Sequence, residues 1–403
     1  MKNFLAVICT LFLLAFAGAL CAGDDPGVSV RGVWIIRFQM TRPEKIDRFL
    51  EKAGRLGITD LFVQVRGRGD AYYASRYEPR AEALSDHFDP LEYLLNHPLR
   101  KNFRVHAWIN TFYVWSKPGQ PRFRDHLILR RPDWLARPFH GPVDPQDTLY
   151  LNQIRSREGI FLSPLLPGVQ RHILNVVTDI LSRYPVDGLH LDYIRYPGPD
   201  FDFHPYLRRQ FRNRYLIDPL DFKSNPEQFL RQYTRAGYDY YSFSWGKFLQ
   251  DGLSRFVQRL SQRVRQRFPG VLLTAAVKAD LAQAHWKYYQ SWERWVKNGW
   301  LDYVVPMNYT ANNLTFVQRI RVMLQEVSPD RIVMGVSLYN QTPAQVAEKI
   351  RRVQQIGLKG ATLFSYDQVE ENTGLERYIR REWDRSGPAK SLRMALPVQP
   401  SQP

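Results

Sequence analysis

The chain has almost no cysteine: only Cys9 and Cys21 occur among its 403 residues. Both fall in or beside the apolar N-terminal stretch, so the rest of the chain has no cysteine pair to cross-link. A small secreted domain held together by disulfides is therefore excluded. A chain of this length does not need such bonds, because a large domain buries enough apolar surface to be stable without them.

Spacings typical of metal and nucleotide sites are also missing. The nine histidines are scattered, with no His-x-His, His-Glu-x-x-His or cysteine-rich spacing, so we predict no metal site and no cofactor. Neither a Gly-x-Ser-x-Gly elbow nor a Gly-x-x-x-x-Gly-Lys loop occurs. His106 and His190 alternate with apolar residues of expected strands, and we expect them to form hydrogen bonds inside the fold.

Long apolar runs are absent except at the N-terminus, where one extends from Phe4 to about Leu20 and ends in small residues. It is too short for a typical membrane anchor and fits a signal peptide over residues 1–22, followed by a linker over 23–30. Lipidation of Cys21 is less favoured, because Leu20 stands where a lipobox has a small residue. We therefore expect an exported protein of the periplasm or cell envelope, with no transmembrane helix after the leader.

Acidic residues are scarce relative to basic ones, with 39 Asp and Glu against 56 Lys and Arg and a net charge of +17. This excess favours association with an anionic envelope surface or polymer, while the arginines clustered over 207–267 also fit solvated helix faces. Nucleic acid is not an expected partner of an exported protein. Residues 386–403 are rich in Pro, Ser and Gln, and we expect a disordered tail there.

Eight short apolar or aromatic segments alternate, for the most part, with amphipathic helical patterns, which predicts an α/β fold, a (β/α)8 TIM barrel over residues 31–385. Two connections exceed what a crossover needs: residues 111–166 after the third strand and 194–270 after the fourth. Long loops at this end of a barrel commonly build the substrate cleft. The expected strands are Gly32–Phe38, Asp60–Val65, Arg104–Asn110, Gly188–Tyr193, Val271–Val277, Tyr303–Tyr309, Ile332–Leu338 and Ala361–Tyr366.

Polar and aromatic residues gather where these strands end, which is the end that carries the active site in barrel enzymes. The clearest case is Asp192, a carboxylate that closes the apolar fourth strand. Amide side chains suit a sugar site because they donate and accept hydrogen bonds at once, and flat aromatic rings can face pyranose rings. The predicted substrate-binding residues are Gln64, Arg66, Trp108, Asn110, Tyr193, Arg195, Asn308, Tyr309 and Tyr366.

Several of these segments carry recognisable motifs. They are Arg31-Gly32-Val33-Trp34, the run from Val63 to Tyr73, His106-Ala107-Trp108-Ile109-Asn110, the run from Leu191 to Pro197, and Pro306-Met307-Asn308-Tyr309. Together they resemble the glycosyl-hydrolase-like family 10, in the family's order, from about residue 29 to 375. The resemblance implies a TIM-barrel glycosidase of the bacterial envelope, similar to a member that cleaves peptidoglycan glycan strands stripped of their peptides.

Glycoside hydrolysis requires a group that protonates the glycosidic oxygen and a carboxylate that supports the transition state or activates water. Asp192 is our first choice for one of them. Pairing with Arg195 would keep Asp192 ionised, whereas burial among aromatic rings would raise its pKa and favour the acid role. The sequence leaves both roles open.

The second carboxylate is less defined. In chitinase-like barrels the sequence of the fourth strand resembles Asp-Gly-x-Asp-x-Asp-x-Glu. The present chain has Ile194 where the terminal glutamate of that motif would be. Three other acids follow strand ends: Asp280, which we rank first, Asp70 and Asp367. Asp70 beside Gly69 is equally typical of a turn. For Asp367 a surface acid is favoured over a catalytic one.

The leading hypothesis is an exported glycoside hydrolase that cleaves a β-linked amino-sugar polymer such as the glycan strands of peptidoglycan, with Asp192 as its principal catalytic carboxylate. One alternative is a lytic transglycosylase on the same polymer, which would need a single acid/base carboxylate. Another is a barrel that binds glycan and has lost catalysis, since no second acid is evident at the fourth strand.

Overall fold

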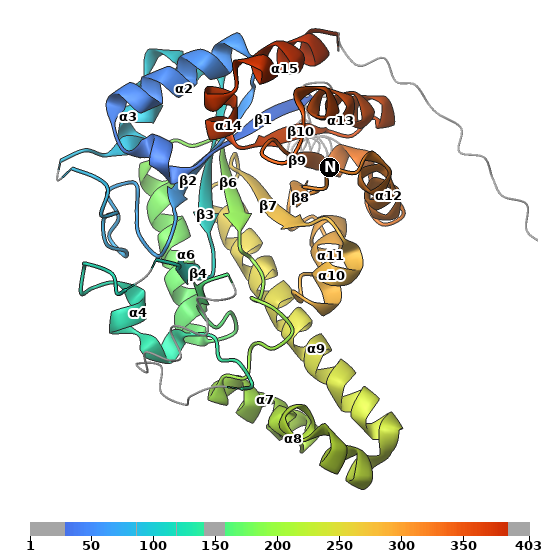
Figure 1. The fold of residues 1–403 in the computed structure, drawn as a ribbon. Helices are drawn as coiled ribbons and strands as arrows, with labels where there is room; N and C mark the ends of the chain where they lie inside the picture. The colour runs from blue at the N-terminus through green and yellow to red at the C-terminus, as the bar shows by residue number, and fades with distance from the viewer. Residues whose placement is uncertain (1–28, 86, 118, 141–157, 386–403) are drawn as a thin grey trace, which may run out of the picture.

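A computed structural model of the chain describes residues 29–85, 87–117, 119–140 and 158–385. Eight parallel strands close into a barrel whose order around the circle follows the chain, with β10 hydrogen-bonded to β1 (Figure 1). The predicted (β/α)8 fold is therefore confirmed. The strands are β1 (Val30–Ile35), β2 (Asp60–Arg66), β3 (Arg104–Asn110), β6 (Gly188–Asp192), β7 (Leu272–Lys278), β8 (Tyr303–Met307), β9 (Val333–Ser337) and β10 (Gly360–Phe364).

Helices surround the barrel (Figure 1). Their buried residues are largely apolar. In the first of them the buried residues are spaced as an amphipathic helix requires, at Ile46, Phe49, Leu50 and Ala53. Many of these helices begin with proline, whose missing N–H costs nothing in the first turn. The main surrounding helices are α2 (Pro43–Arg55), α3 (Pro90–Asn96), α6 (Pro167–Arg183), α9 (Pro226–Arg267), α11 (Trp292–Lys297), α12 (Asn313–Leu324), α13 (Pro343–Ile356) and α15 (Thr373–Arg385).

The long loop after β3 carries a small antiparallel sheet, in which β4 (Tyr113–Trp115) pairs with β5 (Ile160–Phe161). The segment after β6 is mostly helical: α7 (Pro205–Tyr215) and α8 (Pro219–Ser224) lie beside the N-terminal half of α9, which projects away from the barrel (Figure 1). The two predicted insertions are therefore present, but much of the second forms this helical projection.

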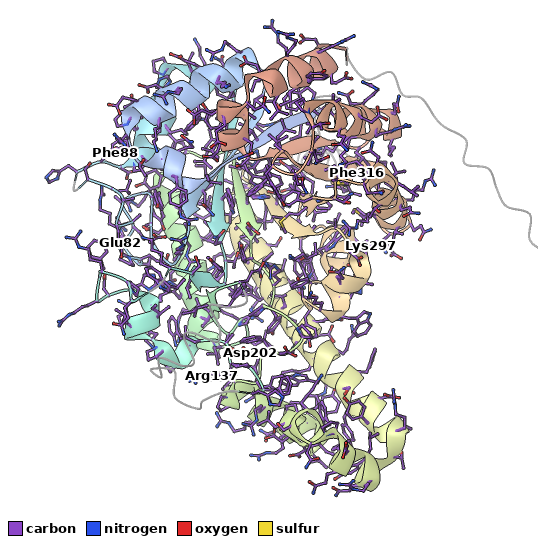
Figure 2. The ribbon with its side chains drawn as sticks, viewed as in Figure 1. Glu82, Phe88, Arg137, Asp202, Lys297 and Phe316 are labelled. Carbon is purple, nitrogen blue, oxygen red and sulfur yellow. The ribbon has the colours of Figure 1, made fainter. Side chains whose placement is uncertain are left out.

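Hydrogen bonds connect the two insertions near Asp202, a buried residue labelled in Figure 2. Its Oδ1 accepts a hydrogen bond from the Arg137 backbone N at 2.8 Å, and the Phe203 N donates to the Arg137 carbonyl at 2.8 Å. Burial raises the pKa of Asp202. These contacts hold the segment that follows β6 against the segment that follows β3.

The barrel interior contains the two histidines expected there. His106 Nε2 bonds to Asp60 at 2.9 Å, and His190 bonds through Nδ1 to the Thr274 hydroxyl at 2.8 Å. Trp34 Nε1 donates to His190 Nε2 at 3.2 Å, and burial lowers the His190 pKa well below its usual value, so this imidazole is neutral. The expectation of hydrogen-bonded histidines inside the fold is confirmed.

The described elements extend from Val30, the last residue of the expected linker, to Arg385. The signal peptide predicted over 1–22, nearly all of the linker 23–30 and the tail over 386–403 lie outside the described residues. Within the described part of the chain, no helix combines the length and apolar character that crossing a membrane requires.

Candidate active site

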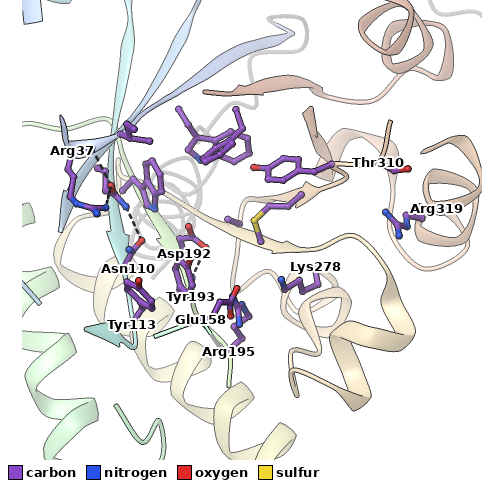
Figure 3. Close-up of a pocket in the computed structure, with 18 residues that line it drawn as sticks. Arg37, Asn110, Tyr113, Glu158, Asp192, Tyr193, Arg195, Lys278, Thr310 and Arg319 are labelled. Carbon is purple, nitrogen blue, oxygen red and sulfur yellow. Dashed lines mark hydrogen bonds and ion pairs between the residues drawn. The ribbon is translucent and has the colours of Figure 1, made fainter. Parts of the chain in front are cut away.

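A cavity of about 700 Å³ opens at the C-terminal ends of the barrel strands (Figure 3). Seven of the predicted site residues line it: Gln64, Trp108, Asn110, Asp192, Tyr193, Arg195 and Tyr309. The other lining residues are Trp34, Ile36, Arg37, Tyr113, Glu158, Ala276, Lys278, Met307, Thr310, Arg319 and Phe364.

Asp192 is the last residue of β6, and 7% of its surface is exposed. Its carbonyl accepts a hydrogen bond from the Thr111 N at 2.7 Å, which fixes the strand end, and its Oδ1 accepts one from the Tyr193 N at 2.7 Å. Burial raises the pKa of the Asp192 carboxyl to about 6, although the Tyr193 N–H and the charges of Arg195 and Lys278 act in the opposite direction. Burial therefore favours the acid role.

Arg195 pairs with a residue that the sequence did not single out, Glu158. The Arg195 Nη2 donates to both carboxylate oxygens of Glu158, at 2.9 and 3.0 Å, and the Arg195 side chain is 3% exposed while that of Glu158 is 38% exposed. The guanidinium also lies 4.8 Å from the ring centres of Tyr193 and Tyr288. Glu158 and Asp192 are the two carboxylates among the described residues that line the cavity.

Glu158 was missed because it precedes β5 in the long third loop rather than following a barrel strand. The available signal was its location: an acid next to the short apolar run Ile160-Phe161-Leu162, inside a loop expected to build the cleft. That pattern marks a short strand but does not say that the strand pairs with β4 beside the barrel mouth.

Aromatic rings form much of the cavity wall. Tyr193 has a left-handed backbone (φ 49°) and stacks on Tyr113 with ring centres 4.6 Å apart. Tyr309 stacks on Phe364 at 5.3 Å and meets the edge of Trp34 at 6.3 Å. These rings give the cavity flat apolar faces of the kind that pack against sugar rings.

The amide side chains of the cavity are held in place by one another. Gln64 Nε2 donates to Asn110 Oδ1 at 3.2 Å, and Asn110 Nδ2 donates to the Gly67 carbonyl at 2.7 Å. The Arg37 Nη1 donates to Gln64 Oε1 at 3.0 Å. The predicted sugar-binding amides Gln64 and Asn110 therefore reach the cavity in fixed orientations.

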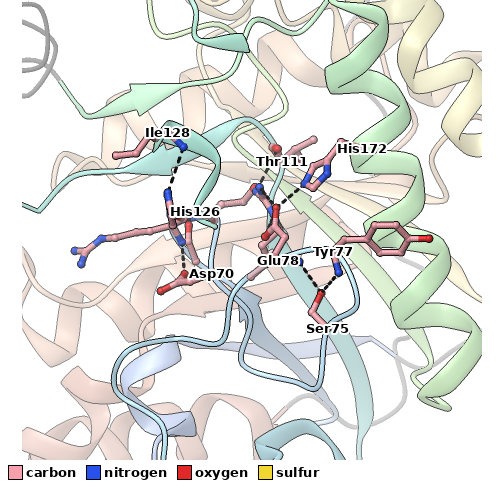
Figure 4. Close-up of polar contacts among 12 residues, drawn as sticks. Asp70, Ser75, Tyr77, Glu78, Thr111, His126, Ile128 and His172 are labelled. Atoms are coloured by element: carbon pink, nitrogen blue, oxygen red, sulfur yellow. Dashed lines mark hydrogen bonds and ion pairs between the residues drawn. The ribbon is translucent and has the colours of Figure 1, made fainter. Parts of the chain in front are cut away.

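The structure does not bring Arg66 into the cavity lining. Its side chain is fully buried and paired with Glu78, with Nη2 to Oε1 at 2.6 Å and Nε to Oε2 at 2.7 Å. His172 also bonds to Glu78 at 2.8 Å (Figure 4), and Arg66 donates to the Asn110 carbonyl. Arg66 thus supports the strand that carries Asn110.

The candidates for a second carboxylate have other partners. Asp280 is the N-cap of α10 (Leu281–Trp286), where its Oδ1 accepts from the Gln283 N at 3.0 Å. Asp70, labelled in Figure 4, accepts from the Arg68 N at 2.6 Å in the turn after β2. Neither is among the described residues that line the cavity.

Asp367 is likewise held by hydrogen bonds outside the cavity lining, from Gln39 Nε2 at 2.8 Å and the Ser365 hydroxyl at 3.0 Å. Among the described residues, Glu158 rather than Asp280, Asp70 or Asp367 is therefore the carboxylate that shares the cavity with Asp192. In the described ranges, no three His, Cys, Asp or Glu side chains gather as metal ligands would.

Two further predicted residues lie behind the cavity surface. Asn308 is buried, donates to the Phe316 carbonyl at 3.0 Å and accepts from Arg319 at 3.2 Å, so it positions a residue that does line the cavity. Tyr366 is buried with its ring 5.9 Å from that of Phe49. Neither Asn308 nor Tyr366 is among the described residues that line the cavity.

The sequence profile of the family described as glycosyl hydrolase-like 10 matches residues 29–355. The chain belongs to this family. The resemblance drawn from the motifs is thus confirmed, and the match includes every strand up to β9 and all the described cavity residues except Phe364.

Two proteins with similar sequences are named glycosyl hydrolases. DigH of Escherichia coli (strain K12) is 24% identical over 295 residues, which cover 68% of this chain and 59% of DigH. YngK of Bacillus subtilis (strain 168) is 23% identical over 286 residues, which cover 65% of this chain and 48% of YngK. The chain therefore spans about half to three fifths of the length of these relatives.

Solved structures agree with the barrel fold. The glycoside hydrolase domain of PgaB (BpsB) from Bordetella bronchiseptica superposes with a TM-score of 0.64 at 13% identity, covering 87% of this chain and 98% of that domain. The catalytic domain of β-amylase from Paenibacillus polymyxa gives 0.57 at 12% identity, covering 90% and 100%. At such identities the likeness concerns the fold alone.

Proposed function

We propose that the chain is an exported glycoside hydrolase that cleaves a β-linked amino-sugar polymer, with the glycan strands of peptidoglycan as its substrate. The observation that carries the proposal is the placement of Asp192: a buried carboxyl with a raised pKa, at a strand end inside a cavity that holds one further described carboxylate. Membership of the glycosyl hydrolase-like 10 family supports it.

Asp192 acts as the general acid. A carboxyl with a pKa of about 6 keeps its proton in mildly acidic conditions and can give it to the glycosidic oxygen as the bond from that oxygen to the anomeric carbon breaks. The charge that then develops on Asp192 is stabilised by the Tyr193 N–H and by the nearby positive side chains Arg195 and Lys278.

Glu158 is the second carboxylate. Arg195 donates hydrogen bonds to both of its oxygens and so fixes their position. As a carboxylate, Glu158 offsets the positive charge of an oxocarbenium-like transition state. In the proposed reaction Glu158 also takes a proton from the attacking water, whose oxygen bonds to the anomeric carbon. The sugar rings pack on the aromatic walls and their hydroxyls bond to Gln64 and Asn110.

The test is cleavage of purified glycan strands by the wild type, by Asp192→Asn and by Asp280→Asn, with the products identified by mass spectrometry. Loss of a general acid costs roughly a hundredfold or more in rate, so Asp192→Asn should be nearly inactive. Asp280→Asn is the matched control, because asparagine also serves as an N-cap and should leave the rate within about twofold.

Each alternative has its own outcome. Products that end in an anhydro sugar, instead of an ordinary reducing sugar, would indicate a lytic transglycosylase and not a hydrolase. Binding of strands without turnover at any pH would indicate the inactive glycan-binding barrel. Full activity of Asp192→Asn would overturn the assignment of Asp192.

Export and retention in the envelope are part of the proposal. The net charge of +17 supports electrostatic association with an anionic wall or membrane surface. Released protein should therefore increase as cell fractions are washed with increasing salt, since screening weakens such contacts. Recovery of the protein from the cytosol would contradict export.

A further inference from the structure

The cavity contains more positive than negative side chains. Its described lining has four basic residues, Arg37, Arg195, Lys278 and Arg319, against the two acids Asp192 and Glu158. Arg195 is paired with Glu158. Of the other three, none has a carboxylate within 4 Å among the described residues, so their charge is not neutralised by an ion pair.

Arg319 lies on α12, which follows β8, and reaches the cavity from the side. Its Nη1 donates to Asn308 Oδ1 at 3.2 Å, and Asn308 is itself fixed to the Phe316 carbonyl. A guanidinium has five N–H donors, and this contact uses one of them. The Arg319 side chain is therefore held in position, and its other N–H groups can donate to a ligand.

Lys278 ends β7, the neighbouring strand, and its register partner is Met307 at the end of β8. Its Nζ lies 4.4 Å from the centre of the Tyr288 ring. Burial and the Arg195 charge lower the Lys278 pKa to about 8, while the charges of Glu158 and Asp192 act in the opposite direction without forming an ion pair with it. Figure 3 shows Lys278 and Arg319 on one side of the cavity and Arg37 on the other.

We propose that Arg319 and Lys278 recognise a carboxylate substituent on the sugar, so that the enzyme selects an acidic glycan over a neutral or amine-bearing one. The inference rests on the proposed function and adds the chemical class of the sugar. A neutral sugar would leave both cations without an ion-pair partner, a free amine would repel them, and a carboxylate would pair with the arginine fork. In a peptidoglycan strand freed of peptides, that group is the lactyl carboxylate.

The experiment compares three substrates of equal length: a glycan strand with free lactyl carboxylates, the same strand with its carboxylates converted to primary amides, and a neutral β-1,4-linked N-acetylglucosamine oligomer. The measured quantity is kcat/KM for the wild type, Arg319→Gln and Lys278→Met. The wild type should prefer the acidic strand about ten- to hundredfold, and each variant should reduce that preference severalfold.

Arg321→Gln is the matched control, because Arg321 lies on the same helix but is exposed. It should keep the wild-type preference. The preference is a ratio measured within one preparation, so a loss of folded protein in Arg319→Gln cancels. Dissociation constants for the acidic and amidated strands in an Asp192→Asn background should show the same preference without turnover.

Equal kcat/KM of the wild type on all three glycans would leave the hydrolase intact and overturn the carboxylate inference alone. An undiminished preference in both Arg319→Gln and Lys278→Met would overturn the assignment to these residues. Failure of the wild type to cleave any of the three would overturn the proposed function, and the inference with it.

Discussion

The Arg195 Nη2 binds both carboxylate oxygens of Glu158, at 2.9 and 3.0 Å, and so the nearest arginine to Asp192 in sequence is committed to another acid. The Asp192 carboxyl accepts a hydrogen bond from the Tyr193 N–H, and burial is the largest influence on its pKa. The two carboxylates of the cavity thereby differ in their surroundings: Glu158 is paired with an arginine, whereas burial raises the pKa of Asp192 to about 6.

The pH profile should report this difference. Catalysis by protonated Asp192 requires kcat/KM to fall as the pH rises through about 6, the pKa of its carboxyl. A kcat/KM series from about pH 4 to 9 checks it. An alkaline limb that begins only above about pH 8 would contradict the acid role.

Lys278→Met should move that limb to higher pH. The Lys278 charge lowers the Asp192 pKa, so its removal makes the carboxyl harder to ionise. We expect a shift of roughly half a unit to one unit, measured on the amidated strand so that recognition of a substrate carboxylate does not enter. An unchanged limb, or one at lower pH, would show that Lys278 does not act on Asp192.

Asp192→Asn should stabilise the fold near neutral pH. The folded pKa of about 6 lies above the ordinary value of 3.8, so the stability contributed by the protonated carboxyl is present at low pH and lost as the pH rises through 6. Asparagine does not titrate. The variant should gain about 2 kcal/mol over the wild type between about pH 4 and 7.5, measured by urea unfolding. A pH-independent difference would argue against the raised pKa.

Arg66→Met should strongly lower the free energy of unfolding of the protein. Burial alone would raise the pKa of Glu78, but the Arg66 charge and the His172 hydrogen bond lower it to about 2, so Glu78 is a buried anion that needs its partner. Removing the arginine should cost about 3–5 kcal/mol in the free energy of unfolding. The double variant Arg66→Met/Glu78→Met should lose less than the single one, and a larger loss would show that the pair is not coupled.

Much of the barrel could be predicted from local patterns, because each strand is an apolar run bounded by turn residues. The third strand occupies the expected Arg104–Asn110. The first ends at Ile35 instead of Phe38, since Arg37–Met40 forms a 3-10 helix whose apolar residues continue the pattern of the strand. Apolar periodicity alone does not separate these two backbone shapes.

The site was harder to predict, because it depends on contacts between distant segments. Every residue of β2 is buried, so alternation along that strand could not tell that Gln64 faces the cavity while Arg66 meets Glu78 twelve residues later. Glu158 reaches the cavity through pairing of β5 with β4. Asp280 follows a strand end as an active-site acid would, but an N-cap occupies the same kind of position.

The pairing of β5 with β4 also means that different parts of the fold position the two carboxylates. Asp192 ends a barrel strand whose hydrogen bonds run to both neighbouring strands, so the closed barrel itself fixes its position. Glu158 lies just before β5, in the loop that carries the two-stranded sheet outside that circle. Exchanging this loop between related barrels would change which side chain stands beside Asp192 in the cavity without altering the barrel strands. The loop after β3 is therefore the segment to exchange when the chemistry proposed for this cavity is to be redesigned.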